Sequence, residues 1–240
     1  MNKILVASLA LVATAGVASA QTVRLGTEGA YMPWNGLDEN NEVTGFEREV
    51  GDRLCEIAGL TCEWVINDWD SIIPNLVAGN YDAIIAGMSI TAERDEVIDF
   101  TAEYYPPSPS LYMALAGGSA DGVIAAQTNT IQAGYVANEG GDLVEFSTPD
   151  ETIAAVRSGE ADAVLADGDY LTPIVSESGG ELAIVGEPVY IGGGVGMGLR
   201  EDDDDLEAAF NAAIETMKSD GSLNALIIKW FDNGESAAIY

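Results

Sequence analysis

Two distant segments of the chain follow the same pattern, residues 76–86 (LVAGNYDAIIA) and residues 156–166 (VRSGEADAVLA). In each segment a helix-compatible run ends at a glycine suited to a helix C-cap, and an Asp-Ala pair and an apolar strand follow. Because this pattern of a helix followed by a buried strand occurs twice, the chain is constrained to two α/β units of similar construction. In open sheets of this kind, ligands bind beyond the carboxyl ends of the strands. The residues that follow the two strands are therefore the first candidates for a site.

Strands and helices alternate along the rest of the sequence. Strands are predicted at residues 23–27, 62–66, 83–86, 123–126, 143–146, 163–165 and 195–199, and helices at residues 46–58, 71–78 and 150–157. Two amphipathic helices are predicted to end the chain, because apolar residues recur there with helical spacing. This alternation is typical of βαβ units in parallel sheets.

Two stretches interrupt the alternation and suggest two lobes. Residues 105–109 (YPPSP) cannot be helical, and residues 192–194 are three consecutive glycines. We interpret both stretches as crossings between a first lobe, residues 21–107 and 193–240, and a second lobe inserted into it, residues 108–192. Two crossings make a hinge, and hinged closure around a ligand is a known mode of conformational change.

The first twenty residues read as an export signal. Lys3 supplies the positive start, residues 4–17 the apolar middle, and Ala18-Ser19-Ala20 the small-residue cleavage site. We therefore expect a mature protein that begins near Gln21 and is located in the periplasm. No later segment is long enough to span a membrane.

Composition excludes several classes of function. Acidic residues outnumber basic ones by 40 to 9, the net charge is −31, and histidine is absent. Nucleic acid is excluded as a partner because phosphate binding needs clustered lysine and arginine. Catalytic sets that depend on histidine are impossible, and two cysteines without histidine do not supply the ligands of a typical zinc site. The glycine run at residues 192–198 does not fit a nucleotide-binding motif, so we expect neither a metal nor a cofactor.

Cys55 and Cys62 are the only cysteines, and an exported chain with two cysteines usually joins them. On one continuous helix they would lie ~10.5 Å apart along the axis, too far for a disulfide. The helix must therefore end between them, and Gly59 is the natural position.

The charged residues near the two repeated strands suggest what the site binds. Ser89 and Arg94 follow the first strand, and Asp167 follows the second. An arginine can hold both oxygens of a carboxylate, and an aspartate can hold an ammonium group. Facing each other across a cleft, the two groups would suit a zwitterion such as an amino acid. The alternative for Ser89 and Arg94 is a helix N-cap followed by a surface arginine.

Three further residues follow predicted strands or lie in adjacent loops. Tyr31 and Trp69 lie beside glycine, proline, asparagine and aspartate, where a ring can stack on a ligand. Glu28 follows the first strand, three residues before Tyr31, so that carboxylate and ring can line one pocket.

The motifs around these residues resemble one family, the periplasmic solute-binding proteins of polar amino-acid ABC transporters, in particular the lysine/arginine/ornithine- and histidine-binding proteins. The motifs are TGFE at residues 44–47, DWD at 68–70, IIPNL at 72–76, YDAII at 81–85, SIT at 89–91 followed by Arg94, and DGSL at 220–223. The resemblance implies the type II periplasmic binding protein fold, with a mainly parallel sheet flanked by helices in each lobe. Cys55 and Cys62 match a disulfide of the cationic amino-acid binders.

The resemblance also implies how the two ends of an amino acid would be bound. Arg94 would bind the α-carboxylate, helped by Ser89 and by the backbone around Thr130, and Asp167 would bind the α-ammonium group.

The side chain of the ligand would lie elsewhere in the pocket. Tyr31 and Trp69 would flank it, and Glu28 would meet a cationic tip. The pocket would also be lined by Ala86, Gly87 and Met88. Ala86 and Gly87 stand where lysine/arginine binders tend to carry serines.

The function implied is the binding component of an amino-acid ABC transporter, with an L-amino acid, most readily a cationic one, as ligand. Its partners would be that ligand and a membrane permease, and the protein would be a monomer. One alternative is an enzyme on the same fold, a cyclohexadienyl-type dehydratase, because Glu28 and Asp167 are carboxylates able to do acid-base chemistry. Another is a sensor module, although the chain ends soon after Trp230 with no signalling domain attached.

Overall fold

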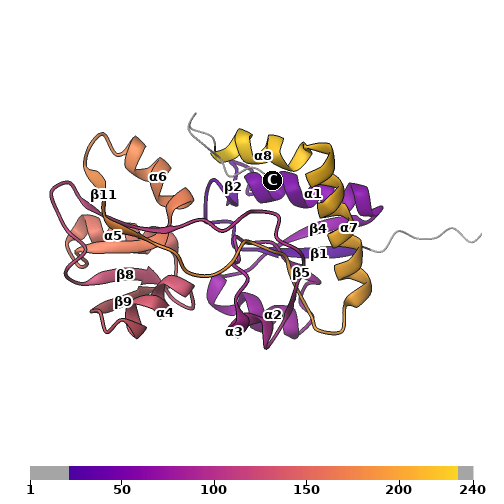
Figure 1. The fold of residues 1–240 in the computed structure, drawn as a ribbon, viewed down its shortest axis with the longest axis horizontal. Helices are drawn as coiled ribbons and strands as arrows, with labels where there is room; N and C mark the ends of the chain where they lie inside the picture. Colours follow the sequence, from indigo (N-terminus) through magenta and orange to yellow (C-terminus); the bar gives the residue numbers. More distant parts are fainter. Residues whose placement is uncertain (1–21, 232–239) are drawn as a thin grey trace, which may run out of the picture.

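The computed structural model describes residues 22–231 and Tyr240. The chain forms two lobes that lie side by side (Figure 1), each built on a five-stranded sheet with helices on its faces. The expected export signal, residues 1–20, lies outside the described residues. Of the helices that the structure describes, none combines the length and the apolar character that a membrane crossing requires.

The sheet of lobe 1 has the strand order β4-β1-β5-β12-β6. Its strands are β1 (Thr22–Thr27), β4 (Thr61–Ile66), β5 (Ala83–Ile84), β6 (Asp99–Phe100) and β12 (Gly198–Leu199). β1 pairs in parallel with β4 and β5, whereas β12 is antiparallel to both β5 and β6. β12 therefore runs against the other strands of its sheet. A small hairpin of β2 (Gly36–Leu37) and β3 (Val43–Thr44) lies apart from the sheet.

The sheet of lobe 2 repeats this arrangement with the order β9-β8-β10-β7-β11. Its strands are β7 (Ser110–Leu115), β8 (Ile124–Gln127), β9 (Leu143–Phe146), β10 (Ala163–Asp167) and β11 (Leu182–Val189). β8 pairs in parallel with β9 and β10, and β7 is antiparallel to β10 and β11. The reversed strand of each lobe, β7 or β12, is the first one that the chain forms after crossing from the other lobe. The predicted fold class, with a mainly parallel sheet in each lobe, is confirmed.

The Asp-Ala pair of the sequence repeat has a structural role. The Asp82 N–H donates to the Arg24 carbonyl oxygen at 2.8 Å, and the Asp82 carboxylate accepts the Arg24 N–H at 2.9 Å. Asp162 makes the same two bonds to Val123, both at 2.8 Å. In each lobe, an aspartate thus fixes the start of the third strand of the βαβαβ unit against the first strand.

Helices cover both faces of each sheet. Lobe 1 carries α1 (Phe46–Ala58), the 3-10 turn η1 (Trp69–Ser71), α2 (Ile72–Val77), α3 (Ala92–Asp95), α7 (Asp204–Asp220) and α8 (Ser222–Phe231), and lobe 2 carries α4 (Ile131–Asn138), α5 (Pro149–Ser158) and α6 (Gly168–Glu177). Phe46 and Leu54 of α1 share one buried cluster with Phe210 and Met217 of α7 and Ile227 of α8. The C-terminal helices therefore complete the core of the first lobe.

The predicted disulfide between Cys55 and Cys62 is present. α1 ends at Ala58, and Gly59 follows as its C-cap in the left-handed conformation, with φ at 69°. This turn brings the two Cα atoms to 6.2 Å, within the range that a disulfide spans.

The two connectors between the lobes lie against each other. The Val195 N–H donates to the Tyr105 carbonyl oxygen at 2.8 Å, and Val195 also forms a β-bridge with Ser89. Gly194 is required at this crossing because a Cβ atom there would lie 2.7 Å from the Tyr105 oxygen. The expected strand at residues 195–199 is shorter than predicted because Val195 pairs with the other connector and only Gly198–Leu199 enters the sheet. The lobe boundaries themselves stay a prediction.

Candidate ligand-binding site

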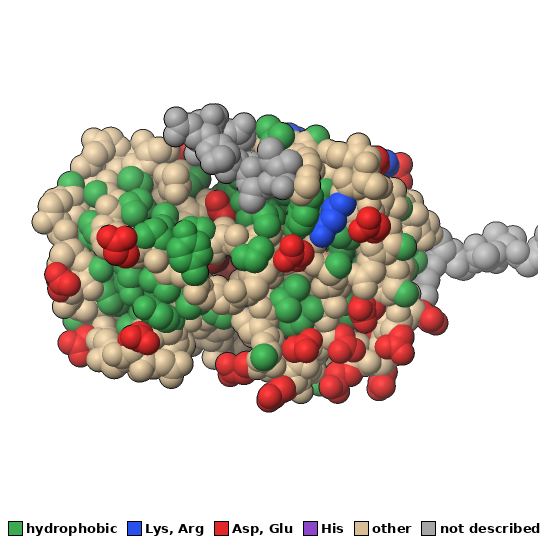
Figure 2. Space-filling model, in the orientation of Figure 1, with side chains coloured by type: hydrophobic (Ala, Val, Ile, Leu, Met, Phe, Trp, Pro, Cys, Tyr) green, Lys and Arg blue, Asp and Glu red, His purple; other side chains and the backbone are tan. Residues whose placement is uncertain are grey.

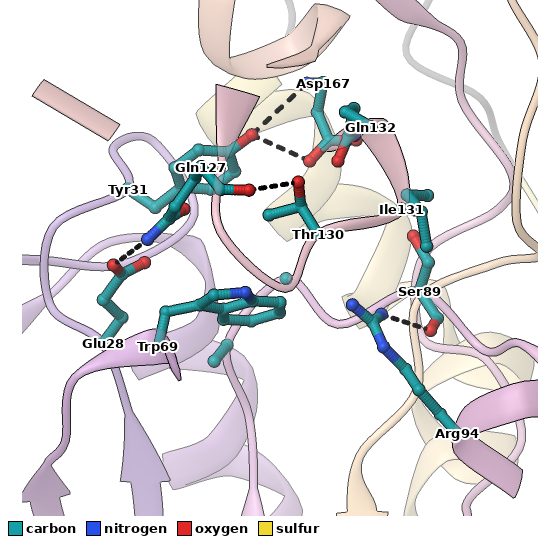
Figure 3. A pocket seen from close by; sticks show the side chains of 12 residues that line it. Glu28, Tyr31, Trp69, Ser89, Arg94, Gln127, Thr130, Ile131, Gln132 and Asp167 are labelled. Carbon is teal, nitrogen blue, oxygen red and sulfur yellow. Dashed lines mark hydrogen bonds between the residues drawn. The ribbon is translucent and has the colours of Figure 1, made fainter. Parts of the chain in front are cut away.

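A pocket lies between the lobes, where the carboxyl ends of strands from both sheets meet (Figure 3). β1 leads into Glu28 and β5 into residues 86–89, while β8 ends at Gln127 and β10 at Asp167. The empty space among the side chains, including the part that is open to solvent, is about 360 Å³. The lining residues are Glu28, Tyr31, Trp69, Ala86, Gly87, Ser89, Arg94, Gln127, Thr130, Ile131, Gln132 and Asp167.

Arg94, in the short helix α3, presents its guanidinium to this pocket (Figure 3). Its Nη1 donates to the backbone oxygen of Ser89 at 2.8 Å, and its Cζ lies 5.3 Å from the centroid of the Trp69 ring. These two contacts fix the orientation of the planar group. Burial lowers the pKa of Arg94 to about 10, although the nearby Asp167 carboxylate raises it. Arg94 is thus still a cation at neutral pH, but a poorly hydrated one.

Arg94 differs from six of the seven other cationic side chains of residues 22–231. Six of them lie within salt-bridge distance of a carboxylate, and Lys218 lies 3.9 Å from the ring centroid of Tyr240. Over the described part of the chain, no carboxylate reaches Arg94 at such a distance. The chain has 40 acidic residues, and acidic side chains lie on both lobes in Figure 2. An arginine in the cleft with no described carboxylate as its partner therefore indicates a site shaped for an anion from outside.

Asp167 faces the cleft from the end of β10 in the other lobe. Its Oδ2 accepts the Tyr31 hydroxyl at 2.8 Å, and its Oδ1 accepts the Gln132 amide nitrogen at 2.8 Å (Figure 3). Burial raises the pKa of Asp167 to about 6, and the hydrogen bond from Tyr31 works against this rise. At neutral pH the group is therefore largely ionised and able to bind an ammonium group.

Glu28 occupies another end of the pocket. The Gln127 side-chain nitrogen donates to Glu28 Oε1 at 2.6 Å, so that this contact also joins the two lobes. Burial raises the pKa of Glu28 to about 7, the bond from Gln127 lowers it, and the charges of Asp68 and Asp150 raise it further. A cation placed beside Glu28 would favour its ionised form.

Tyr31 crosses the cleft with both its ring and its hydroxyl. One face of the ring stacks on Tyr170 of α6, with the centroids 4.2 Å apart and an interplanar angle of 17°. Its hydroxyl also accepts the Asp167 N–H at 3.3 Å. Tyr31 therefore links lobe 1 to lobe 2, a role that sequence analysis did not predict. Its contact with a ligand side chain stays a prediction.

One buried carboxylate supports the lobe 1 side of the pocket. Glu47 accepts hydrogen bonds from the Gly87 N–H at 2.6 Å, from the Asn35 amide at 2.7 Å, and from the Tyr104 hydroxyl. The Asn35 side-chain oxygen in turn accepts the Gly29 N–H at 2.7 Å. Glu47 thus ties together the loop after β1, the turn after β5 and one connector between the lobes.

The predicted ligand-binding residues line this pocket with one exception, Met88. Its side chain is fully buried in a hydrophobic cluster with Trp69 and Ile84. The chain bends at Gly87, whose φ is 62°, and after this bend Met88 turns into the core of lobe 1, while Ser89 lines the pocket.

Three lining residues were not predicted, namely Gln127, Ile131 and Gln132. Gln127 ends β8, and the rule that ligands bind beyond strand ends could have identified it. Ile131 and Gln132 belong to the first turn of α4, whose N-cap is Thr130. The partial positive charge of a helix N-terminus favours anions, so this turn adds to the anion-binding character of the Arg94 side.

Two α/β lobes, joined by paired connectors and with oppositely charged groups across their cleft, define the class of two-lobed solute-binding proteins of the type II periplasmic binding protein fold. Within this class, the chain belongs to the bacterial extracellular solute-binding proteins, family 3, whose family model matches residues 23–233.

Individual relatives agree with this assignment. The chain is 68% identical to a crystallised periplasmic His/Glu/Gln/Arg/opine family-binding protein from Silicibacter pomeroyi in complex with lysine, with a TM-score of 0.88 over 91% of this chain and 100% of that one. It is 31% identical to the lysine/arginine/ornithine-binding periplasmic protein of Escherichia coli, over 95% of this chain and 94% of that protein. It is also similar, at 26% identity and a TM-score of 0.80 over 88% and 96% of the two chains, to an ancestral amino acid-binding protein described as a precursor of cyclohexadienyl dehydratase.

Proposed function

We propose that this protein is the periplasmic binding component of an ABC transporter for an L-amino acid with a cationic side chain. The observation that carries the proposal is Arg94, a desolvated cation without a carboxylate partner among the described residues, in the same cleft as Asp167. The lysine bound to the 68%-identical protein supports the choice of a cationic ligand. We also propose that the chain is cleaved near Ala20, acts as a monomer and delivers its ligand to a membrane permease.

The proposed pose follows from charge. The α-carboxylate of the ligand lies between Arg94 and the first turn of α4, and the α-ammonium group lies at Asp167. The side chain then extends along Trp69 toward Glu28. Every formal charge of a cationic amino acid would meet an opposite charge, which a buried ion requires.

A calorimetric screen tests this function directly. The twenty amino acids, ornithine, citrulline, polyamines and betaines are titrated into the mature protein, and we expect the largest affinity for lysine, arginine, ornithine or histidine. If no zwitterionic amino acid bound, the proposal would be wrong.

We propose that no catalysis accompanies binding, since the relatives described above are binding proteins. The bound ligand should be recovered unchanged after prolonged incubation, as judged by NMR. Conversion of the ligand, or turnover of a prephenate-like acid, would favour the dehydratase alternative.

The lobes are proposed to close by a hinge at the two connectors. Arg94 and Asp167 belong to different sheets, so both ends of one ligand can be held only when the lobes are together. The ligand therefore has a higher affinity for the closed state and shifts the population toward it. Small-angle scattering should give a smaller radius of gyration at saturating lysine than without ligand. An unchanged profile with bound lysine would argue for a rigid site.

Replacing Glu28 by glutamine should reduce the preference for cationic side chains. The variant keeps the size and polarity of the side chain but removes the charge, and a ligand ammonium or guanidinium would lose its ionic partner. We expect lysine and arginine binding to weaken by about 10-fold or more, from the energy of a hydrogen bond to a charged group, and glutamine binding to change little. Calorimetry with lysine and glutamine measures the ratio of the two affinities. If this ratio were the same in Glu28→Gln and in the wild-type protein, Glu28 would lie outside the site that binds the ligand side chain.

Binding of lysine should weaken as the pH falls from 8 to 5. Burial raises the pKa of Glu28 to about 7 and that of Asp167 to about 6. Below these values the carboxyl groups take up protons, and a cationic ligand must displace them before it binds. We expect lysine affinity to be about 100- to 1000-fold lower at pH 5 than at pH 8, from the linkage between proton and ligand binding. Glu28→Gln should show a shallower dependence, and equal slopes for the two proteins would contradict the role of Glu28.

A further inference from the structure

Gln127 is held at the same end of the pocket as Glu28, but it comes from the other lobe. It is the last residue of β8, and the residue is only 8% exposed. Its side-chain nitrogen donates to Glu28 Oε1 at 2.6 Å and to the Ser147 carbonyl oxygen at 3.1 Å. Its backbone oxygen accepts the Thr130 hydroxyl at 2.6 Å. Both the main chain and the amide of Gln127 are therefore fixed by neighbouring groups.

The orientation of the amide leaves its oxygen available. An ionised Glu28 offers only acceptors, so the amide nitrogen of Gln127 must face it, because two oxygens would repel each other. Within residues 22–231, no protein donor reaches the Gln127 amide oxygen or the second carboxylate oxygen of Glu28, and neither atom is sealed from solvent. The pocket therefore presents two free acceptors close to each other, one from each lobe.

The electrostatic surroundings of this end favour a cation. Besides Glu28 itself, Asp68 and Asp150 contribute negative charge there. In addition to burial, the charges of Asp150 and Glu28 raise the pKa of Tyr170 of α6. Hydrogen bonds in which one partner is charged are roughly twice as strong as neutral ones. A ligand group with a positive charge and more than one N–H would thus gain most from two acceptors.

We propose that Gln127 is a specificity-determining residue, whose amide oxygen accepts an N–H of the cationic side chain of the ligand while Glu28 accepts another. This inference rests on the proposed function and adds to it the chemical class of the ligand tip, an ammonium or guanidinium group with at least two N–H donors. Because the two acceptors come from different lobes, the side chain of the ligand forms hydrogen bonds with both lobes when the cleft closes.

The test compares three variants with the wild-type mature protein by calorimetry with lysine, arginine and glutamine. Gln127→Met removes the acceptor at similar size, and Gln127→Asn keeps the amide but withdraws it by one methylene. Gln127→Glu keeps an acceptor but loses the donor to Glu28. We expect Gln127→Met and Gln127→Asn to weaken lysine and arginine binding by about 10- to 100-fold, the effect of a hydrogen bond to a charged group. Glutamine binding should weaken less, and Gln127→Glu should keep its preference for lysine over glutamine.

Several outcomes would overturn the inference. An unchanged ratio of lysine to glutamine affinity in Gln127→Met and Gln127→Asn would exclude a role in specificity. An equal loss for Gln127→Glu and Gln127→Met would mean that Gln127 acts only as a donor to Glu28. Thermal melting of each ligand-free variant checks the fold, and Gln127→Asn decides the question if Gln127→Met does not fold. If the wild-type protein bound no cationic amino acid, the proposed function itself would fail, which separates the two conclusions.

Discussion

Replacing Arg94 by lysine is expected to weaken amino-acid binding by about 30- to 5000-fold, the range for disrupting a buried, hydrogen-bonded charge pair. The variant keeps the positive charge, so the loss of affinity measures the contribution of the planar guanidinium geometry. Arg94 is oriented by the Ser89 carbonyl oxygen and by the ring of Trp69. In this orientation its guanidinium N–H groups can bind both oxygens of a carboxylate. Lysine is a point charge and cannot hold both oxygens in this way.

The fold should survive this substitution because Arg94 makes no ion pair with a described carboxylate, so its loss leaves no buried acid unpaired. Arg157→Lys is a matched control, because Arg157 pairs with Glu181 on the surface at 3.2 Å and such exposed pairs contribute little. Calorimetry with lysine and thermal melting without ligand should be measured for both variants. Near-wild-type affinity in Arg94→Lys would remove Arg94 from the site.

Much of the fold could be predicted from sequence because its elements obey local rules. The helix at residues 46–58 carries an apolar face and ends at Gly59, and its bounds agree with α1. Other elements break those rules. α6 begins at Gly168 and contains Pro173, and β11 contains both Gly186 and Pro188. Such sequences form a helix or a strand only because the surrounding lobe supports them, so local propensity could not identify them.

Some residues of the candidate site could likewise be predicted from the sequence, and others could not. Arg94 and Asp167 stood out because charged residues in the segments that follow buried strands are chemically conspicuous. Gln127 occupies an equivalent position at a strand end, but a neutral amide gives no such signal until Glu28 is seen beside it. The link from Tyr31 to Tyr170 depends on how the two lobes face each other, which is a property of the hinge and not of either segment. The charged residues of the candidate site could therefore be proposed from the sequence, whereas the contacts that cross the cleft could not.

Replacing Asp167 by asparagine should have an effect of similar size, about 30- to 5000-fold on lysine binding. The two side chains have the same shape, so the change removes the charge and little else. Asp167 is the proposed partner of the α-ammonium group, and the Arg94 cation lines the same cleft. Without the carboxylate, the ammonium group of the ligand would be desolvated beside that cation with no anionic partner.

A ligand control makes this prediction specific to the ammonium group. 6-Aminohexanoic acid has the carboxylate and the side-chain amine of lysine but lacks the α-amine, so Asp167 has nothing to bind in it. In a double-mutant cycle of protein and ligand, wild-type protein should prefer lysine strongly, and Asp167→Asn should bind the two compounds with nearly equal affinity. Thermal melting should show a folded variant, because the asparagine oxygen can still accept a hydrogen bond from Gln132 or Tyr31. A preference for lysine that persisted undiminished in Asp167→Asn would show that the α-ammonium group is bound elsewhere.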